Sequence, residues 1–128
     1  MTEPMKQHGA FSWNELMTTD VEAAKTFYGD LFGWTLEGMQ TNDVAYTMAK
    51  AGDREVAGLM AMPPEADTMP PTWGAYVTVD DVEASAKQVE ALGGEIMLAP
   101  RDIPDVGRFC VICDPQVATL SLITYINK

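Results

Sequence analysis

Positive charge is scarce in this sequence, and histidine is nearly absent. Eight Lys and Arg residues stand against nineteen Asp and Glu residues, which gives a net charge of −11. A field of that sign repels phosphate backbones and anionic lipid surfaces, which argues against nucleic acid or a membrane as a partner. The single histidine, His8, lies in an N-terminal segment, residues 1–9, that we expect to be a loose arm. We therefore do not expect His8 to bind a ligand or metal.

Long apolar runs are missing as well. None approaches the roughly 18 residues that a helix needs to span a bilayer. The opening MTEPMKQHGAF lacks the basic stretch followed by an apolar block that is typical of a secretory signal. We expect a cytoplasmic protein.

Cysteine occurs only twice, as a C-x-x-C pair formed by Cys110 and Cys113. The pair lies within GRFCVICDP, a β-rich run in which residues three apart point to opposite faces. Redox pairs of this spacing usually sit at a helix start, and a zinc site needs further ligands. The sequence therefore favours buried structural thiols over redox or zinc chemistry.

The chain contains the same unit twice, 61 residues apart. TDVEAAKTFYGDLFGW begins at Thr19 and DDVEASAKQVEALGGE begins at Asp80. Each copy follows a strand-like run, FSWNELMT or WGAYVTVD, and precedes further strand-like runs. With 128 residues and 47% apolar content, the two copies would share one globular domain. Such a repeat predicts equivalent residues on facing walls of one cavity.

Local signals set the expected boundaries of each copy. Thr19 and Asp80 are the predicted helix N-caps, each followed three residues later by a glutamate, and glycines at 33 and 93–94 are the predicted stops. The predicted strands are 11–18, 34–39, 44–49 and 55–62 in the first copy, and 73–79, 95–98, 108–113 and 119–125 in the second. A proline-rich stretch over 63–72 reads as a stiff linker.

This pattern predicts an α+β fold of two tandem βαβββ modules, at about 10–62 and 73–126, within a single domain 1–128. One helix would cover the outer face of each part of a curled mixed sheet. The concave face would remain for a ligand.

Three fragments carry a family resemblance: DVEAAKTFYGDLFGW from Asp20, the VDDVE opening of the second helix, and GRF…DP from Gly107. They resemble the vicinal oxygen chelate superfamily, which includes glyoxalase I, extradiol dioxygenases, and fosfomycin and bleomycin resistance proteins. The strand-one W-x-E-L and the F-G-W helix end are similar to its glyoxalase-related branch. The resemblance implies the βαβββ fold over most of the chain and pairing as a homodimer.

The resemblance also implies a metal site with one ligand, usually His or Glu, from each of four strands. Those positions fall on Trp13, Gly58, Gly74 and Ser121. None of these residues offers the imidazole, carboxylate or thiolate donors that such sites need. We therefore expect no cofactor and no metal-dependent glyoxalase or dioxygenase activity, with a divalent metal kept as the alternative. Val117 is a further departure, because a turn glycine is common there in the family.

Strand alternation indicates which side chains face the cavity. Leu16 should pack under the first helix, which leaves Glu15 on the cavity side. The residues predicted to bind the ligand are Trp13, Met17, Val56, Met60, Tyr76, Ser121 and Ile123, with Arg108 at the mouth of the cavity unless it forms a surface salt bridge. The predicted lining is aromatic and methionine-rich, with space left at two glycines.

Three functions stay open at this point. The first is metal-free binding of a small, largely apolar or aromatic molecule. The second is a lyase or isomerase in which Glu15, held away from water, acts as general base, with Tyr76 or Ser121 donating to the developing oxyanion. The third is a non-catalytic dimeric domain in which Trp13 and the methionines fill the cavity as core.

Overall fold

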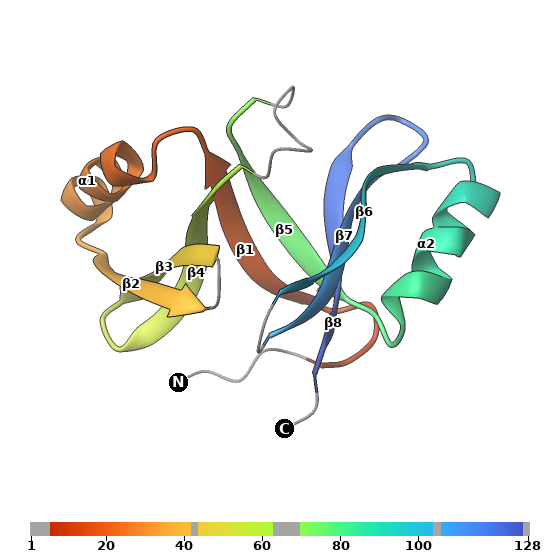
Figure 1. Cartoon of the computed structure of the whole chain (residues 1–128), viewed down its shortest axis with the longest axis horizontal. Coiled ribbons are helices and arrows are strands. Elements are labelled where there is room, and N and C mark those ends of the chain that lie inside the picture. The colour runs from red at the N-terminus through yellow and green to blue at the C-terminus, as the bar shows by residue number, and fades with distance from the viewer. Residues whose placement is uncertain (1–5, 42–43, 63–69, 104–105, 127–128) are drawn as a thin grey trace. The chain divides into compact units, whose positions relative to one another are not determined.

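The computed structural model describes residues 6–41, 44–62, 70–103 and 106–126. The elements in chain order are β1 (Phe11–Thr18), α1 (Val21–Phe32), β2 (Thr35–Thr41), β3 (Val44–Ala51), β4 (Arg54–Ala61), β5 (Thr72–Thr78), α2 (Val82–Ala91), β6 (Glu95–Ile103), β7 (Gly107–Cys113) and β8 (Thr119–Tyr125). This order confirms the predicted α+β fold of two tandem βαβββ modules (Figure 1). We call β1–β4 with α1 module one, and β5–β8 with α2 module two.

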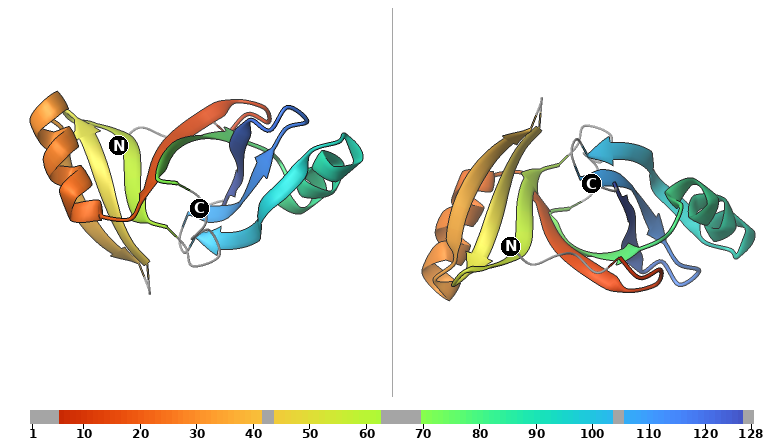
Figure 2. Two further views of the ribbon diagram at one scale, coloured as in Figure 1. Left: turned by 90° about the horizontal axis from the view of Figure 1, so that it is seen from above. Right: turned by 90° about the horizontal axis from the view of Figure 1, so that it is seen from below.

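Module one is a four-stranded sheet in the order β2-β3-β4-β1, with α1 along one face (Figure 2). β1 runs parallel to β4, whereas β3 is antiparallel to both of its neighbours. The core between α1 and the sheet consists of small and branched side chains: Leu16, Ala24, Ala49, Ala57 and Leu59. As predicted, Leu16 packs under the helix, which places its neighbours in β1 on the opposite face.

Module two repeats this plan in the order β5-β8-β7-β6, with β5 parallel to β8. Its core against α2 contains Val79, Val82, Ala86, Cys110, Ile112 and Leu122. The predicted burial of both thiols is confirmed, since Cys110 is 0% exposed and Cys113 is 3% exposed. Thr124 ties the helix to the sheet: its hydroxyl donates to the Val79 carbonyl and accepts from the Val82 amide.

The helix caps differ from the prediction by one residue in both modules. Asp20, not Thr19, accepts the Ala23 amide at the start of α1, and Asp81, not Asp80, caps α2. Aspartate is among the strongest capping residues, and its short carboxylate reaches the free amides of the first turn. Gly33 ends α1 as predicted, in the left-handed conformation at φ 73°.

The chain forms two compact units: one is residues 13–73, and the other combines the described residues 6–12 with the chain from Gly74 onward. The expectation of a loose arm is wrong for its described part. The Gly9 amide donates to the Thr78 carbonyl at 2.7 Å, and the Thr78 amide donates to Ala10 at 2.8 Å. These bonds extend pairing beyond the predicted strand. Most of the predicted linker, 63–69, lies outside the described residues.

No helix in the described part of the chain combines the length and apolarity that crossing a membrane requires.

Candidate functional site

The far face of module one, opposite α1, gathers most of the residues that the sequence predicted there. Trp13, Glu15 and Met17 alternate along β1. In the parallel pairing with β4, Glu15 stands beside Gly58 and Met17 beside Met60. Partners in register share a face of the sheet, so these five residues form one surface.

Tyr46 belongs to the same surface and was not predicted from the sequence. It is the register partner of Met60 in β3. Its hydroxyl accepts a hydrogen bond from the Trp13 indole at 2.9 Å. A Cβ placed on Gly58 would lie 1.5 Å from that hydroxyl oxygen. The space expected at Gly58 is therefore filled, because the tyrosine lies across the glycine.

Glu15 is a buried carboxylate on this surface, with only 3% of its area exposed. It stands next to Gly58, the residue over which the Tyr46 hydroxyl lies. An ionised side chain is rarely placed so far from water unless polar partners or function require it. The Trp13–Tyr46 pair and Glu15 thus give this face two polar groups within an apolar setting of methionines.

Val56 departs from the predicted alternation. It packs against the helix-side core instead of the far face. Ala49 pairs with Ala57 and Lys50 pairs with Glu55, so Val56 is an extra residue in β4 without a partner in β3. Such a bulge interrupts the period of two on which the prediction depended. The assignment of Val56 to the ligand face is therefore corrected.

The far face of module two contains the remaining predicted residues. Tyr76 stands beside Ser121, and Thr78 beside Ile123, in the parallel β5–β8 pairing. The Tyr76 ring packs against Phe109 with 6.0 Å between centroids. Tyr76 is 1% exposed and Ser121 is 5% exposed. Ser121 and Ile123 therefore lie on the same face as Tyr76, as alternation predicted. Their role in ligand binding stays a prediction.

Arg108 lies in an ion-pair cluster and not in a far face. Its guanidinium donates to Glu83 of α2 and to Asp102 of β6, the latter at 3.0 Å. These hydrogen bonds, that of Glu83 first, raise the pKa of Arg108 above its ordinary value. The surface salt bridge that the sequence left open is thus formed, and both carboxylates already engage the arginine.

The Cys110 thiol is expected to be unreactive near neutral pH. Burial, and to a smaller extent the negative charge of Glu83, raises its pKa to about 11. Thiolates and not thiols are the nucleophiles and metal ligands, so this shift works against both roles near neutral pH.

The residues at the four family metal positions do not fit a metal. Trp13 is engaged as a donor to Tyr46, and the Tyr46 hydroxyl occupies the side-chain space of Gly58. Across the residues that the structure describes, no three His, Cys, Asp or Glu side chains gather where they could hold one ion. An indole and a glycine provide none of the donors that divalent metals prefer.

Comparison with known sequences identifies the family of this chain. A family model described as the Glyoxalase/Bleomycin resistance protein/Dioxygenase superfamily matches residues 10–120. A putative glyoxylase, CFP32, of Mycobacterium tuberculosis is 42% identical over 122 residues, covering 91% of this chain and 46% of the relative. The anthracycline biosynthesis protein DnrV of Streptomyces peucetius is 32% identical over 129 residues, covering 89% of this chain and 46% of the relative. The chain thus spans about half the length of these relatives.

Solved structures share the fold at low sequence identity. Methylmalonyl-CoA epimerase from Mycobacterium tuberculosis superposes with a TM-score of 0.62 at 17% identity, over 99% of this chain and 94% of the epimerase. A Streptomyces coelicolor methylmalonyl-CoA epimerase in complex with 2-nitronate-propionyl-CoA gives 0.64 at 14% identity, over 94% of this chain and 100% of the epimerase.

Proposed function

Because this chain belongs to the glyoxalase/bleomycin resistance protein/dioxygenase superfamily, we propose that it binds a small, largely apolar or aromatic molecule without a metal. The far face of module one is the proposed binding surface. The observation that carries the proposal is the Trp13–Tyr46 hydrogen bond across Gly58, beside the buried Glu15.

The chemistry of this face suits such a ligand. An indole and two methionines, Met17 and Met60, offer polarisable apolar contact that adapts to irregular shapes. The indole N–H can only donate, so the Tyr46 oxygen is the acceptor and its own hydrogen points elsewhere. Small-molecule sites commonly combine apolar walls with a few fixed polar groups that orient the ligand.

The names of the relatives are consistent with organic ligands of several kinds and do not identify one compound. One relative is named for anthracycline biosynthesis, another is a putative glyoxylase, and a structural neighbour is bound to a CoA thioester analogue. Since the chain matches under half of the length of these two curated relatives, their complete activities are not transferred. We propose a planar aromatic or acyl compound as the ligand class.

A thermal-shift screen of the full chain tests the proposal. A panel of aromatic compounds and acyl thioesters should include one that raises Tm, because binding only the native state stabilises it. Trp13→Phe and Tyr46→Phe should each weaken that ligand about tenfold, the value of one lost hydrogen bond. Trp73→Phe is the matched control, since Trp73 bonds to Tyr28 instead. No stabilising compound, or an equal loss in the control, would reject this surface and favour a filled core.

The absence of metal is part of the proposal and has its own test. Metal analysis by mass spectrometry of untagged protein, purified without chelators, should find far less than one equivalent of any transition metal. A full equivalent would show that donors outside the four expected positions bind it.

Burial of Glu15 favours a second candidate function, a lyase or isomerase. A carboxylate held away from water in an apolar face can act as general base toward an acidic C–H bond. With a ligand from the screen, the reaction would be followed as exchange of that hydrogen in D₂O. Glu15→Gln should slow exchange by about 100-fold or more, the usual contribution of a general base. Full exchange in that variant would exclude Glu15 as the base.

A further inference from the structure

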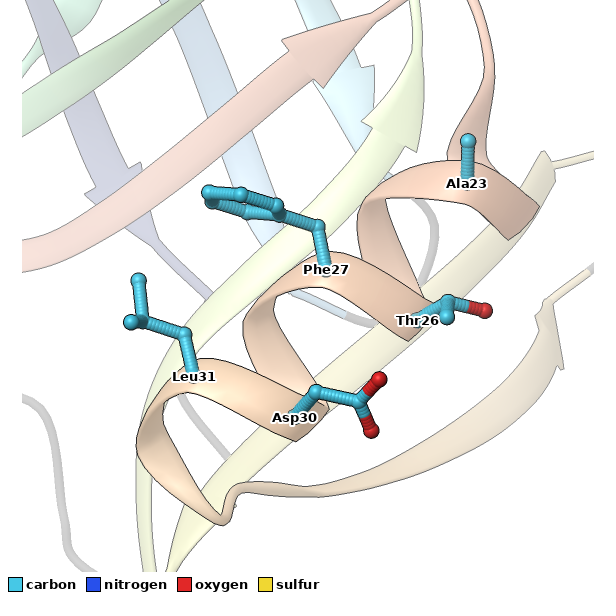
Figure 3. A pocket seen from close by; sticks show the side chains of 5 residues that line it. All are labelled: Ala23, Thr26, Phe27, Asp30 and Leu31. Carbon is cyan, nitrogen blue, oxygen red and sulfur yellow. The ribbon is translucent and has the colours of Figure 1, made fainter.

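An apolar row runs along the exposed side of α1. Ala23, Phe27 and Leu31 are spaced by four residues and project from the same side of the helix (Figure 3). Phe27 is 59% exposed and Leu31 is 58% exposed. Together with Thr26 and Asp30, which border it, the row lines a shallow hollow. We call Ala23, Phe27 and Leu31 the α1 ridge.

Aromatic packing extends the ridge and holds it in place. The Phe27 ring meets Tyr28 edge-on at 4.9 Å, and Tyr28 stacks on Phe32, which is itself 57% exposed. The Trp73 indole donates a hydrogen bond to the Tyr28 hydroxyl at 3.0 Å, so the central ring of this group is fixed from outside the helix. A surface that is already ordered loses little conformational entropy when a partner binds to it.

Negative charge borders the ridge. Glu22, Thr26 and Asp30 form the next row of the helix, and two of these three side chains are carboxylates. Glu22 pairs with Lys25 at 3.5 Å, whereas Asp30 has no ion-pair partner among the residues that the structure describes. Residues 13–73 contain ten acidic and three basic residues, so they carry −7 of the net charge of −11. The ridge therefore belongs to the more negative of the two compact units.

The second module provides an internal reference for both features. The repeat offset of 61 residues relates the ridge to Ala84, Gln88 and Leu92, and relates the charged row to Glu83, Lys87 and Ala91. The corresponding side of α2 is therefore polar at its centre, and its row carries no net charge. A helix whose outer side is only solvated needs no phenylalanine there. The difference indicates that the outer side of α1 has a task that α2 does not share.

We propose that the α1 ridge docks a basic amphipathic helical segment of another protein. Apolar side chains of the segment would pack on Phe27 and Leu31, and a lysine or arginine beside them would reach Asp30. The exposed rings of Phe27 and Phe32 add to this preference, because the face of an aromatic ring attracts a cation. Such a segment combines apolar and positive side chains on one side, which complements the ridge and its negative border.

Charge and area argue against two other occupants. A second copy would bring the same excess of negative charge to the contact, and anionic lipid would be repelled in the same way. With aromatic side chains of about 200 Å² each, the exposed parts of Phe27, Leu31 and Phe32 amount to roughly 300 Å². Stable interfaces between globular proteins bury about 800 Å² per partner. A short segment that lies along one helix needs less area, and we expect it to bind weakly, with a micromolar Kd.

Fluorescence anisotropy of a dye-labelled synthetic peptide, titrated with the full chain up to about 500 µM, tests the contact. The probe is a helical peptide of about 18 leucine and lysine residues with the leucines along one side. One control peptide has glutamate in place of lysine, and another has the same composition with the leucines scattered. The probe should bind with a Kd of about 10–100 µM and weaken about fivefold between about 50 and 300 mM NaCl. Both control peptides should bind at least about tenfold more weakly.

Paired variants of the two modules locate the site. Phe27→Gln, which installs the residue of module two, should weaken binding about tenfold, and Leu31→Gln should weaken it somewhat less. Leu92→Gln is the matched control for this apolar contact. Asp30→Asn should weaken binding about threefold and reduce its dependence on salt, and Glu90→Gln, which removes one exposed charge from α2, is its control. Both controls should leave the Kd nearly unchanged. Thermal melts of all variants should match, since these side chains are exposed.

Three results would overturn the proposal. The first is a probe peptide that does not bind, or that Phe27→Gln and Leu92→Gln weaken equally. The second is self-association in sedimentation equilibrium that Phe27→Gln abolishes, since the ridge would then belong to a second copy. The third is co-sedimentation with vesicles of phosphatidylcholine that Phe27→Gln abolishes, since a lipid surface would then be the occupant. These results do not depend on whether the far face of module one binds a ligand, because α1 covers the opposite face.

Discussion

Modules one and two have the same order of strands and helix but carry different side chains on their far faces. Both helices begin at an aspartate, Asp20 or Asp81, and both cover one face of four strands. On the far face, module one has a hydrogen-bonded Trp13–Tyr46 pair across a glycine. Module two has closely packed aromatic rings of Tyr76 and Phe109 at the same kind of face.

The comparison separates positions that build the fold from positions that are free to specialise. The shared positions are caps, stops and helix-side core, all of which local physics demands in any βαβββ unit. The divergent positions are those on the outer side of the helix and on the far face. We therefore look for function in module one, where the divergent residues are polar within apolar surroundings or aromatic where solvent would accept a polar side chain.

The largest loss of stability should come from adding a side chain at Gly107, where the neighbouring backbone of β8 lies very close. A Cβ there would lie 2.2 Å from the Thr124 carbonyl oxygen, and a backbone atom cannot move aside as a side chain can. Gly107→Ala should destabilise the protein by about 3 kcal/mol, measured by urea denaturation. Gly38→Ala in module one is the control, since a Cβ at Gly38 meets nothing within 4 Å. Equal losses of stability in the two variants would contradict the prediction that only Gly107 is required by a close backbone contact.

A pH effect specific to module two should follow from Cys110. Its pKa rises from an ordinary value of 9.0 to about 11 in the folded protein. Below pH 9 the thiol is protonated in both states; between 9 and 11 only the unfolded state releases the proton, so stability falls as pH rises. The loss should reach about 2 kcal/mol near pH 11. In urea titrations at several pH values, Cys110→Ala should flatten this slope, and an unchanged slope would assign it to other groups.

Adding a side chain at Gly58 should destabilise module one, because it displaces Tyr46. Gly58→Ala forces the tyrosine hydroxyl away and breaks its bond to Trp13, at a cost of about 1–2 kcal/mol. In a Tyr46→Ala background the same change should cost almost nothing, because the obstructing hydroxyl is gone. A double-mutant cycle by urea denaturation measures this coupling. Additive effects would mean that Tyr46 does not restrain this face.

The smallest effect should be a gain at the β7–β8 turn. Val117 has φ 72°, the left-handed conformation that a β-branched residue adopts only under strain. Val117→Gly removes that strain but adds backbone entropy to the unfolded chain. The net gain should be about 0.5 kcal/mol, visible as a small rise in Tm by calorimetry. A lower Tm would show that the exposed valine is held there by contacts worth more than the strain.

Most of the fold could be predicted because its signals are local. The spacing of apolar residues, the capping-box pattern and the glycine stops identified every element, with boundary errors such as the one-residue shift of both helix caps and the early end predicted for the strand from Glu95. That strand continues to Ile103 because its pairing with β7 resumes after bulges. Pairing over a distance leaves no local trace in the sequence.

The candidate site was predicted only in part for the same reason. Alternation along β1 placed Trp13, Glu15 and Met17 on one face, since period two needs no knowledge of partners. Tyr46 was missed because its role depends on a glycine in the next strand. An aromatic residue in one strand and a glycine in its neighbour is a recognisable signal, since aromatic rings often cover strand glycines. Val56 was misplaced by a bulge, which alternation does not reveal.

The contacts of the arm before β1 limit how the protein can be divided into fragments. Its Gly9 and Ala10 are paired with Thr78, and Ser12 is hydrogen-bonded to Tyr125, so the start of the chain serves the second half. Cutting at the proline-rich stretch would give a C-terminal fragment without these partners. A circular permutant that begins near residue 70 and returns through the arm would keep them. Gene fragments that follow the repeat in the sequence are therefore the wrong units for dissecting this protein.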